Sequence, residues 1–206
     1  MDRSPYLRRD NWVGSYYELA LEYCPAGHDE RVMKGLTAAW DEPALSGPWP
    51  NRESYGMLPM MPNALPDEGE IRLFGELHVG RDSSVGCLTF TVREEHNSDW
   101  LDISIPTGML NLSFPTVYPL AHDSNPWLAQ LDRLFVRMAV RIFQAYPFSL
   151  GIIGAEVSGC NREIDVTTKD LKKGGYLVPP ILYEKLRPRH RCETLTGGLR
   201  WFPPAT

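Results

Sequence analysis

Four strand-like segments follow one another between residues 71 and 118, and the connections between them are too short to hold a crossover helix. They cover residues 71–79, 85–94, 100–105 and 109–118, with turn-forming residues between them. Parallel neighbours need a connection of a dozen or more residues, whereas antiparallel neighbours can be joined by a short turn. The sequence therefore predicts antiparallel pairing in this part of the chain.

Three other segments have the character of strands. Residues 15–23 alternate, with large side chains on one face, namely Tyr17, Leu19, Leu21 and Tyr23. The opposite face carries Tyr16, Glu18, Ala20 and Glu22, so we expect a strand with one buried face. Residues 150–157 form a nearly continuous apolar run, which is typical of a strand buried on both faces. Residues 199–202 are expected to form a last strand or an extended tail.

Two segments show helical spacing. Residues 29–40 place apolar side chains three and four apart behind an acidic first turn, and Asp41-Glu42-Pro43 ends the pattern. Residues 125–147 form the longest apolar stripe, with Asn125 as the expected cap and Pro126 at the first helical position. A short helix is expected from Pro180 to Leu186.

The order of these elements predicts an α+β fold, in which an antiparallel or mixed sheet is covered by helices on one side. A chain of 206 residues with 43% hydrophobic side chains suits one compact domain over residues 1–206. Within it, residues 43–70 are rich in proline and are expected to form a long irregular loop whose apolar side chains lie against the body. Residues 169–206 form a basic C-terminal segment.

The charge of the chain is unevenly distributed. Residues 169–200 hold eight Lys/Arg and three Asp/Glu, a net charge of +5, which leaves −10 for the rest of a chain whose total is −5. An acidic total disfavours direct binding to nucleic acid or to anionic lipid, because both depend on Lys and Arg. No apolar run approaches the length needed to span a bilayer, and the first ten residues lack the apolar core of a signal peptide. We expect a cytoplasmic protein.

Four acids surround one tryptophan at a strand connection: Glu94, Glu95, Asp99 and Asp102 around Trp100. An aromatic side chain among carboxylates has the composition of a protein-binding patch, and such a patch would attract a basic partner. The alternative is that Trp100 packs into the core while the acids keep a hairpin soluble. Both interpretations are open from the sequence.

Other chemistry is weakly supported. Short signatures of hydrolases, P-loop proteins, dinucleotide-binding proteins and zinc proteases are absent from the sequence. Glu156 in its apolar run could be a catalytic carboxylate that acts with a histidine, but a structural pairing is the commoner use of such a residue. Cys24, His28, His190 and Cys192 could form a Cys2His2 zinc set only if two distant pairs met, so we expect neither metal nor cofactor.

A basic ridge is expected on the long helix, because Arg133, Arg137 and Arg141 stand four residues apart. Such a ridge could meet phosphates, although a solvated face balanced by nearby acids is more common.

Four stretches of the chain resemble a known protein family. They are Tyr16-Tyr-Glu-Leu-Ala-Leu-Glu-Tyr, Trp40-Asp-Glu-Pro-Ala-Leu-Ser-Gly-Pro-Trp49, Asp99-Trp-Leu-Asp-Ile-Ser-Ile-Pro and Gly151-Ile-Ile-Gly-Ala-Glu156. In these stretches the chain looks like the immunity protein 52 family of bacterial polymorphic-toxin and type VI secretion systems. The resemblance spans nearly the whole chain.

The resemblance implies a non-enzymatic inhibitor that binds a cognate toxin one to one. The toxins of this family are thought to be nucleases of the restriction-endonuclease type, which must present basic side chains to phosphates. An acidic binder would associate rapidly with such a surface and occupy it. The alternatives are a small enzyme that uses Glu156, and an adaptor that uses the basic C-terminal segment.

Overall fold

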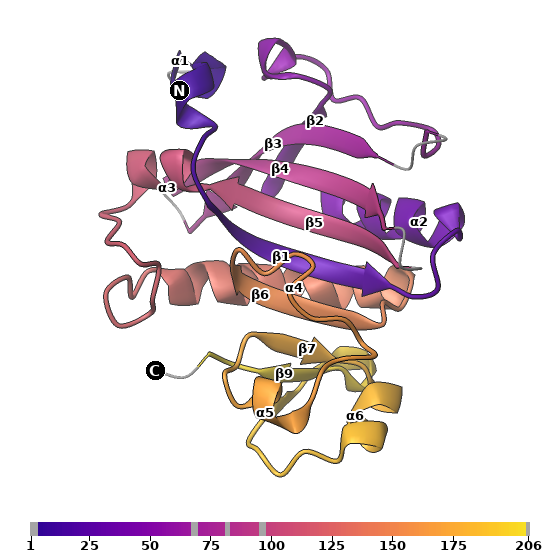
Figure 1. Cartoon of the computed structure of the whole chain (residues 1–206). Coiled ribbons are helices and arrows are strands. Elements are labelled where there is room, and N and C mark those ends of the chain that lie inside the picture. Colours follow the sequence, from indigo (N-terminus) through magenta and orange to yellow (C-terminus); the bar gives the residue numbers. More distant parts are fainter. Residues whose placement is uncertain (1–3, 67–69, 81–82, 95–97, 205–206) are drawn as a thin grey trace.

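The computed structural model describes residues 4–66, 70–80, 83–94 and 98–204 (Figure 1). The strands among these residues are β1 (Tyr16–Tyr23), β2 (Leu45–Trp49), β3 (Ile71–Val79), β4 (Ser83–Arg93), β5 (Asp99–Pro106), β6 (Leu150–Ala155), β7 (Tyr176–Val178), β8 (Glu193–Thr194) and β9 (Arg200–Phe202). They form one nine-stranded sheet in the order β2-β3-β4-β5-β1-β6-β7-β9-β8. Every neighbouring pair is antiparallel.

The helices among the described residues are α1 (Ser4–Leu7), α2 (Asp29–Trp40), α3 (Thr107–Ser113), α4 (Leu128–Ala145), α5 (Thr168–Leu171) and α6 (Pro180–Leu186). Three short 3-10 turns accompany them: η1 (Arg9–Asn11), η2 (Arg52–Ser54) and η3 (Thr196–Gly198). The two long helices, α2 and α4, lie against the same face of the sheet (Figure 1). The predicted α+β class with an antiparallel sheet is therefore confirmed. No helix in the described ranges combines the length and apolar character that crossing a membrane would need.

The main hydrophobic core lies between the sheet and these two helices. The large side chains of β1 that were expected to be buried all point into it, and the Tyr17 ring stacks on Phe135 of α4 with the centroids 6.2 Å apart. Trp40, the last residue of α2, packs directly on Gly75 of β3. A β-carbon on Gly75 would lie 2.4 Å from the Trp40 indole, so glycine is required for this contact. The end of α2 is thus held closely against the sheet.

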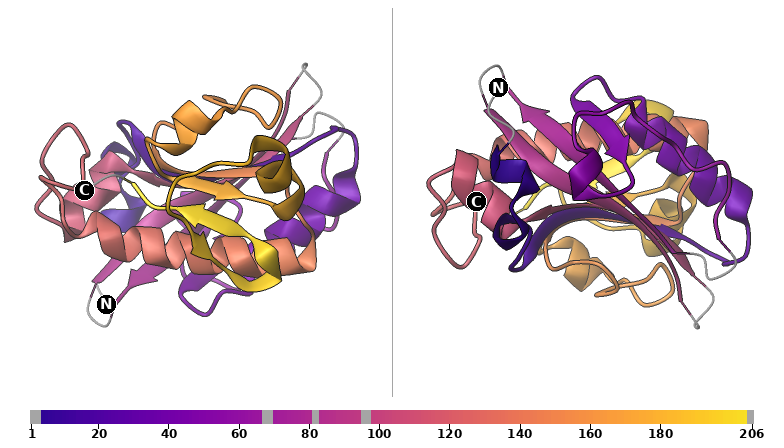
Figure 2. Two further views of the ribbon diagram at one scale, coloured as in Figure 1. Left: turned by 90° about the horizontal axis from the view of Figure 1, so that it is seen from below. Right: turned by 90° about the horizontal axis from the view of Figure 1, so that it is seen from above.

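The opposite face of the sheet, here called the outer face, is covered by separate segments. At the C-terminal end, α5 and α6 pack on β6, β7 and β9 and enclose a smaller apolar cluster that includes Leu150, Ile152 and Phe202. Figure 2 shows α4 and the segment that contains α5 on opposite sides of the sheet. Residues 156–166 cover β1 and β5, and residues 4–12 cover β3 and β4. The outer face is therefore covered by short helices and irregular chain, with no long helix among these described segments.

Two sequence predictions were wrong. Residues 109–118 do not form a strand, because α3 and a loop occupy this stretch. Met109 and Leu110 are adjacent and both buried, a pattern that fits one side of a short helix and not an alternating strand. Residues 43–70 are not wholly irregular, since β2 lies within them. A proline-containing strand is tolerated there because β2 is at the edge of the sheet, where some backbone N–H groups need no partner.

Candidate functional site

The residues predicted for partner binding do not form one exposed patch. Glu95 lies outside the described residues, and Glu94 is half-buried. Asp99, Trp100 and Asp102 are exposed by only 3%, 2% and 6%. Because side chains alternate along a strand, Asp99 points toward the helices whereas Trp100 and Asp102 point to the outer face. The expectation of an exposed acidic patch was therefore wrong, and the alternative of a buried Trp100 fits the structure.

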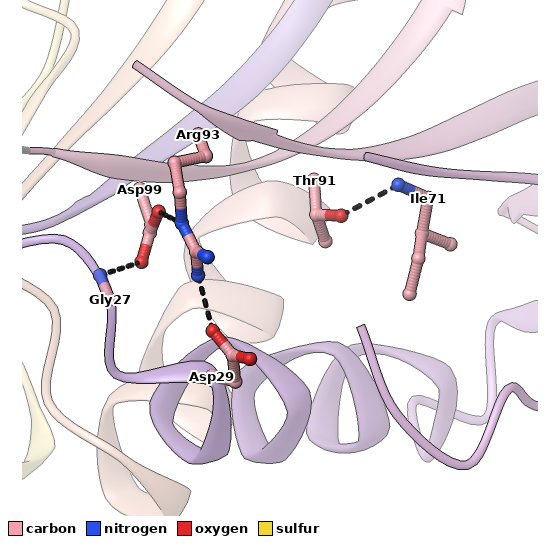
Figure 3. A network of polar contacts seen from close by, with 6 residues as sticks. All are labelled: Gly27, Asp29, Ile71, Thr91, Arg93 and Asp99. Atoms are coloured by element: carbon pink, nitrogen blue, oxygen red, sulfur yellow. Dashed lines mark hydrogen bonds and ion pairs between the residues drawn. The ribbon is translucent and has the colours of Figure 1, made fainter. Parts of the chain in front are cut away.

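Asp99 is part of a clamp between the β4–β5 hairpin and the start of α2 (Figure 3). Its carboxylate accepts hydrogen bonds from the Gly27 backbone N–H at 2.9 Å and from Arg93 Nε at 2.9 Å. Arg93 also forms an ion pair with Asp29 in the first turn of α2. Hydrogen bonds to Asp99 and Asp29 raise the pKa of the Arg93 guanidinium. The acidic side chains of Asp29 and Asp99 thus form contacts within the protein.

Two glutamates of β1 hold residues 156–166 against the outer face. Glu18 accepts a hydrogen bond from the backbone N–H of Ser158 at 2.8 Å, and Glu22 accepts one from the backbone N–H of Glu163 at 2.6 Å. Both glutamates are buried. The polar face expected for β1 is therefore not solvated, because backbone donors about 140 residues later in the chain replace water.

Asp102 lies beside these glutamates, directly opposite Ala20 of β1. Burial, together with the nearby charges of Glu18 and Glu94, raises the pKa of Asp102 to about 7. Burial also raises the pKa values of Glu18 and Glu22. Among the described residues, no Lys or Arg lies within ion-pair distance of Glu18, Glu22 or Asp102. This carboxylate cluster is thus a structural element whose burial favours the protonated forms.

Glu156 has a backbone role as well. Its Oε1 accepts a hydrogen bond from the Tyr16 backbone N–H at 2.6 Å, which ties the end of β6 to the start of β1. The residue adopts a left-handed conformation with φ of 52°, at the point where the chain turns from β6 across the outer face. In the part of the chain that the structure covers, no histidine is hydrogen-bonded to this carboxylate.

The four residues considered for zinc lie in separate places. Cys24 and His28 connect β1 to α2, whereas His190 and Cys192 precede β8 at the far edge of the sheet. Within the described ranges, no group of three or more His, Cys, Asp or Glu side chains is arranged to hold a metal ion.

An exposed apolar loop is present in a region that the charge pattern did not indicate. Met57, Leu58 and Met60 lie within four consecutive residues between η2 and β3, and they are exposed by 65%, 88% and 63%. The expectation that the apolar side chains of residues 43–70 lie against the body holds for Trp49 and Tyr55 but not for these three. We call residues 57–60 the apolar loop.

The base of the apolar loop is fixed. Trp49 Nε1 donates a hydrogen bond to the Met57 carbonyl at 3.0 Å, and the Met60 N–H donates to the Pro48 carbonyl at 2.9 Å. The rings of Trp49 and Tyr55 pack together with centroids 4.6 Å apart. The exposed side chains thus project from an ordered support on β2.

A buried carboxylate supports this base in turn. Glu76 of β3 accepts hydrogen bonds from the hydroxyls of Tyr6, Tyr55 and Ser84. Burial is the main cause of the raised pKa values of Tyr6 and Tyr55, so both phenols remain protonated donors. Three chain segments that are distant in sequence therefore meet at one carboxylate beneath the apolar loop.

This arrangement is suited to binding another protein. Large apolar side chains that cluster on an ordered surface segment are typical of protein interaction sites. An ordered support also reduces the conformational entropy lost on association. Methionine adapts its shape to different partner surfaces because its side chain is unbranched and flexible. The sequence signal that could have identified the site is the run Met57-Leu-Pro-Met-Met61, which is apolar but has neither helical nor strand periodicity.

Comparison of the chain with known families, with curated proteins and with solved structures gives no match.

Proposed function

We propose that this protein is an immunity protein, a non-enzymatic binder that neutralises a cognate bacterial toxin, and that the apolar loop contacts the toxin. The observation that carries the proposal is the exposure of Met57, Leu58 and Met60 on a base fixed by Trp49 and Pro48. The family resemblance of the Trp40 to Trp49 segment adds support, because this segment includes β2 and the base of the loop.

The distribution of charge supports a basic partner such as a nuclease. The apolar loop follows β2 at one edge of the sheet, whereas the basic residues 169–200 surround β7, β8 and β9 at the other (Figure 1). The chain outside residues 169–200 has a net charge of −10. A toxin with a phosphate-binding surface would therefore be attracted to the part of the molecule that carries the loop, and repelled by the C-terminal part.

The experiment is co-expression with the product of the adjacent gene, followed by co-purification and a growth-protection assay in a bacterial host. In the test variant, Met57, Leu58 and Met60 are all replaced by Ser. We expect the variant to lose about 2 kcal/mol or more of binding free energy, roughly thirtyfold in Kd, because a central apolar cluster commonly dominates an interface. Its thermal unfolding should match that of the parent, because these side chains are exposed.

The matched control replaces Ile164 and Ile181 by Ser. These isoleucines are exposed by 77% and 82% and lie on the outer-face segments, away from the apolar loop. The control should bind the toxin as the parent does. Equal loss in both variants would show that the loop has no special role, and a stable protein that neither binds the neighbouring gene product nor protects the host would contradict the immunity function.

A further inference from the structure

A cavity of about 460 Å³ opens between α4 and the end of β9. Its polar lining includes His122, Asp132 and Arg133, and its apolar lining includes Trp201 and Val136. The volume is in the range of small-molecule sites, which combine apolar walls with a few positioned polar groups. The proposed toxin contact, the apolar loop, does not contribute to it.

A buried chain of hydrogen bonds ends at this cavity. The Tyr17 hydroxyl donates to one oxygen of Asp132, and His122 Nε2 lies 2.7 Å from the other. Tyr17 is 1% exposed and Asp132 7% exposed. Burial raises the pKa of Tyr17, so its phenol stays protonated and acts as the donor. Nε2 of His122 is thus engaged with Asp132, and its Nδ1 is left for another partner.

Two arginines stand beside this histidine on the cavity wall. Arg133 and Arg137 are one helical turn apart on α4, so their guanidinium groups project from the same side. Arg133 has no ion-pair partner among the described residues. Arg137 reaches Glu42 only at 3.8 Å and is 61% exposed. Most of the hydrogen-bond donors of both side chains are available to a ligand.

The cavity lining carries acids as well as arginines. Besides Asp132, whose carboxylate is occupied by Tyr17 and His122, the one acid in the described lining is Glu193. Glu193 also borders a neighbouring cavity of about 300 Å³, whose lining includes Lys172, His190 and Arg191. Neither Glu193 nor Asp132 forms an ion pair with Arg133.

We propose that this cavity binds a small organic anion. Its carboxylate or phosphate group lies between Arg133 and Arg137, where guanidinium groups can form paired hydrogen bonds. The anion is within reach of the His122 imidazole, whose protonated form it stabilises. The apolar body of the ligand packs against Trp201 and Val136. This binding is independent of the proposed toxin contact, so either can fail without the other.

The test uses the full chain and follows the ring C–H resonances of His122 by NMR. The probes are benzoate, phenyl phosphate and the neutral analogue benzyl alcohol. Either anion, or both, should shift the His122 resonances saturably with a Kd of about 1 mM or tighter and raise the apparent pKa of this histidine. Saturation by benzoate alone identifies a carboxylate ligand, and saturation by phenyl phosphate alone identifies a phosphate ligand. Failure of both anions to saturate, or an equal response to benzyl alcohol, overturns the proposal.

Two variants locate the binding. Arg133→Gln should weaken the anion roughly tenfold, since it removes one charged partner while leaving the His122 chain intact. Arg141→Gln is the matched control, because Arg141 lies on the same helix but pairs with Glu42 and is not part of the cavity lining. It should bind as the parent does. Unchanged binding in Arg133→Gln, with thermal unfolding equal to the parent, would also overturn the proposal.

Discussion

The two faces of the sheet are covered in different ways. On one face, α2 and α4 pack on the sheet through apolar side chains, and their amphipathic stripes match it along their length. On the outer face, residues 4–12 form only short helical turns and residues 156–166 form neither helix nor strand. Both segments are attached in part through the buried carboxylates Glu18, Glu22 and Glu76. The first cover is held by the hydrophobic effect, whereas the second combines a smaller apolar cluster with hydrogen bonds to buried carboxylates.

Because of this difference, we expect side-chain volume and pH to affect the stability of the two faces differently. Apolar packing responds to a change of side-chain volume and hardly at all to pH. A buried carboxylate without a cation responds to pH, because each proton removed leaves a charge that burial disfavours. We therefore expect pH to act mainly on the stability of the outer-face cover.

The largest expected effect tests whether the outer face is packed as firmly as the helical face. Trp100→Ala should lower the free energy of unfolding by about 3–5 kcal/mol, because it removes a large side chain that is 2% exposed. Phe135→Ala on α4 is the matched substitution on the helical face and should cause a loss of similar size. Urea denaturation of both variants measures the two values. A loss below about 1 kcal/mol for Trp100→Ala alone would mean that the outer cover is loose.

A second prediction concerns pH. The pKa of Asp102 is about 7 in the folded protein and lies above its value in the unfolded chain. Its stabilising contribution is therefore complete below about pH 4 and is lost as the pH rises through about 7. Glu18 and Glu22 act in the same direction. We expect the outer-face carboxylates to lower the free energy of unfolding by about 2 kcal/mol between about pH 5 and pH 8.

Denaturation across this pH range is the measurement, with two variants as comparisons. Asp102→Asn should reduce the pH dependence, whereas Asp41→Asn, at an exposed position after α2, should leave it unchanged. Identical pH profiles for Asp102→Asn and the parent would exclude Asp102 as a source of the effect.

The smallest expected effect is at the clamp that joins the β4–β5 hairpin to α2. Arg93→Gln should lower the free energy of unfolding by about 1 kcal/mol, because Asp99 keeps its hydrogen bond from Gly27 and the arginine is 30% exposed. Lys34→Gln, which breaks an exposed pair with Glu30, is the control and should change stability less. Thermal unfolding of both variants at low and high salt measures the two changes in stability. A larger loss of stability from Lys34→Gln than from Arg93→Gln would contradict the clamp.

The parts of the fold that periodicity determines were predictable. The alternation of β1 and the stripe of α4 gave both the element and its buried face, since each reflects burial against a single apolar surface. The burial of Glu18 and Glu22 was not predictable, because their partners are backbone N–H groups of a segment far along the chain. A sequence lists side chains, and it does not show which backbone groups will lie next to them.

The candidate sites were harder to predict from the sequence than the fold. Grouping Asp99 with Trp100 and Asp102 by their closeness in sequence ignored the alternation that sends them to opposite faces. The apolar loop has no period, and His122 and Asp132 are brought together by the loop before α4, not by regular helical spacing. The expectation of toxin binding comes from the resemblance and stays a prediction, and the resembling stretch from Trp40 to Trp49 ends before the apolar loop begins.

The two edge strands of the sheet influence how this protein can associate with other chains. An open sheet can grow when a foreign strand pairs with an unprotected edge, which leads to aggregation. Here one edge strand, β2, contains Pro48 and an irregular register between Ser46 and Trp49, and the other, β8, has only two residues. Neither edge offers a long regular row of backbone donors and acceptors. Pairing of a foreign strand with either edge is therefore disfavoured, and aggregation by edge-to-edge growth of the sheet should be slow.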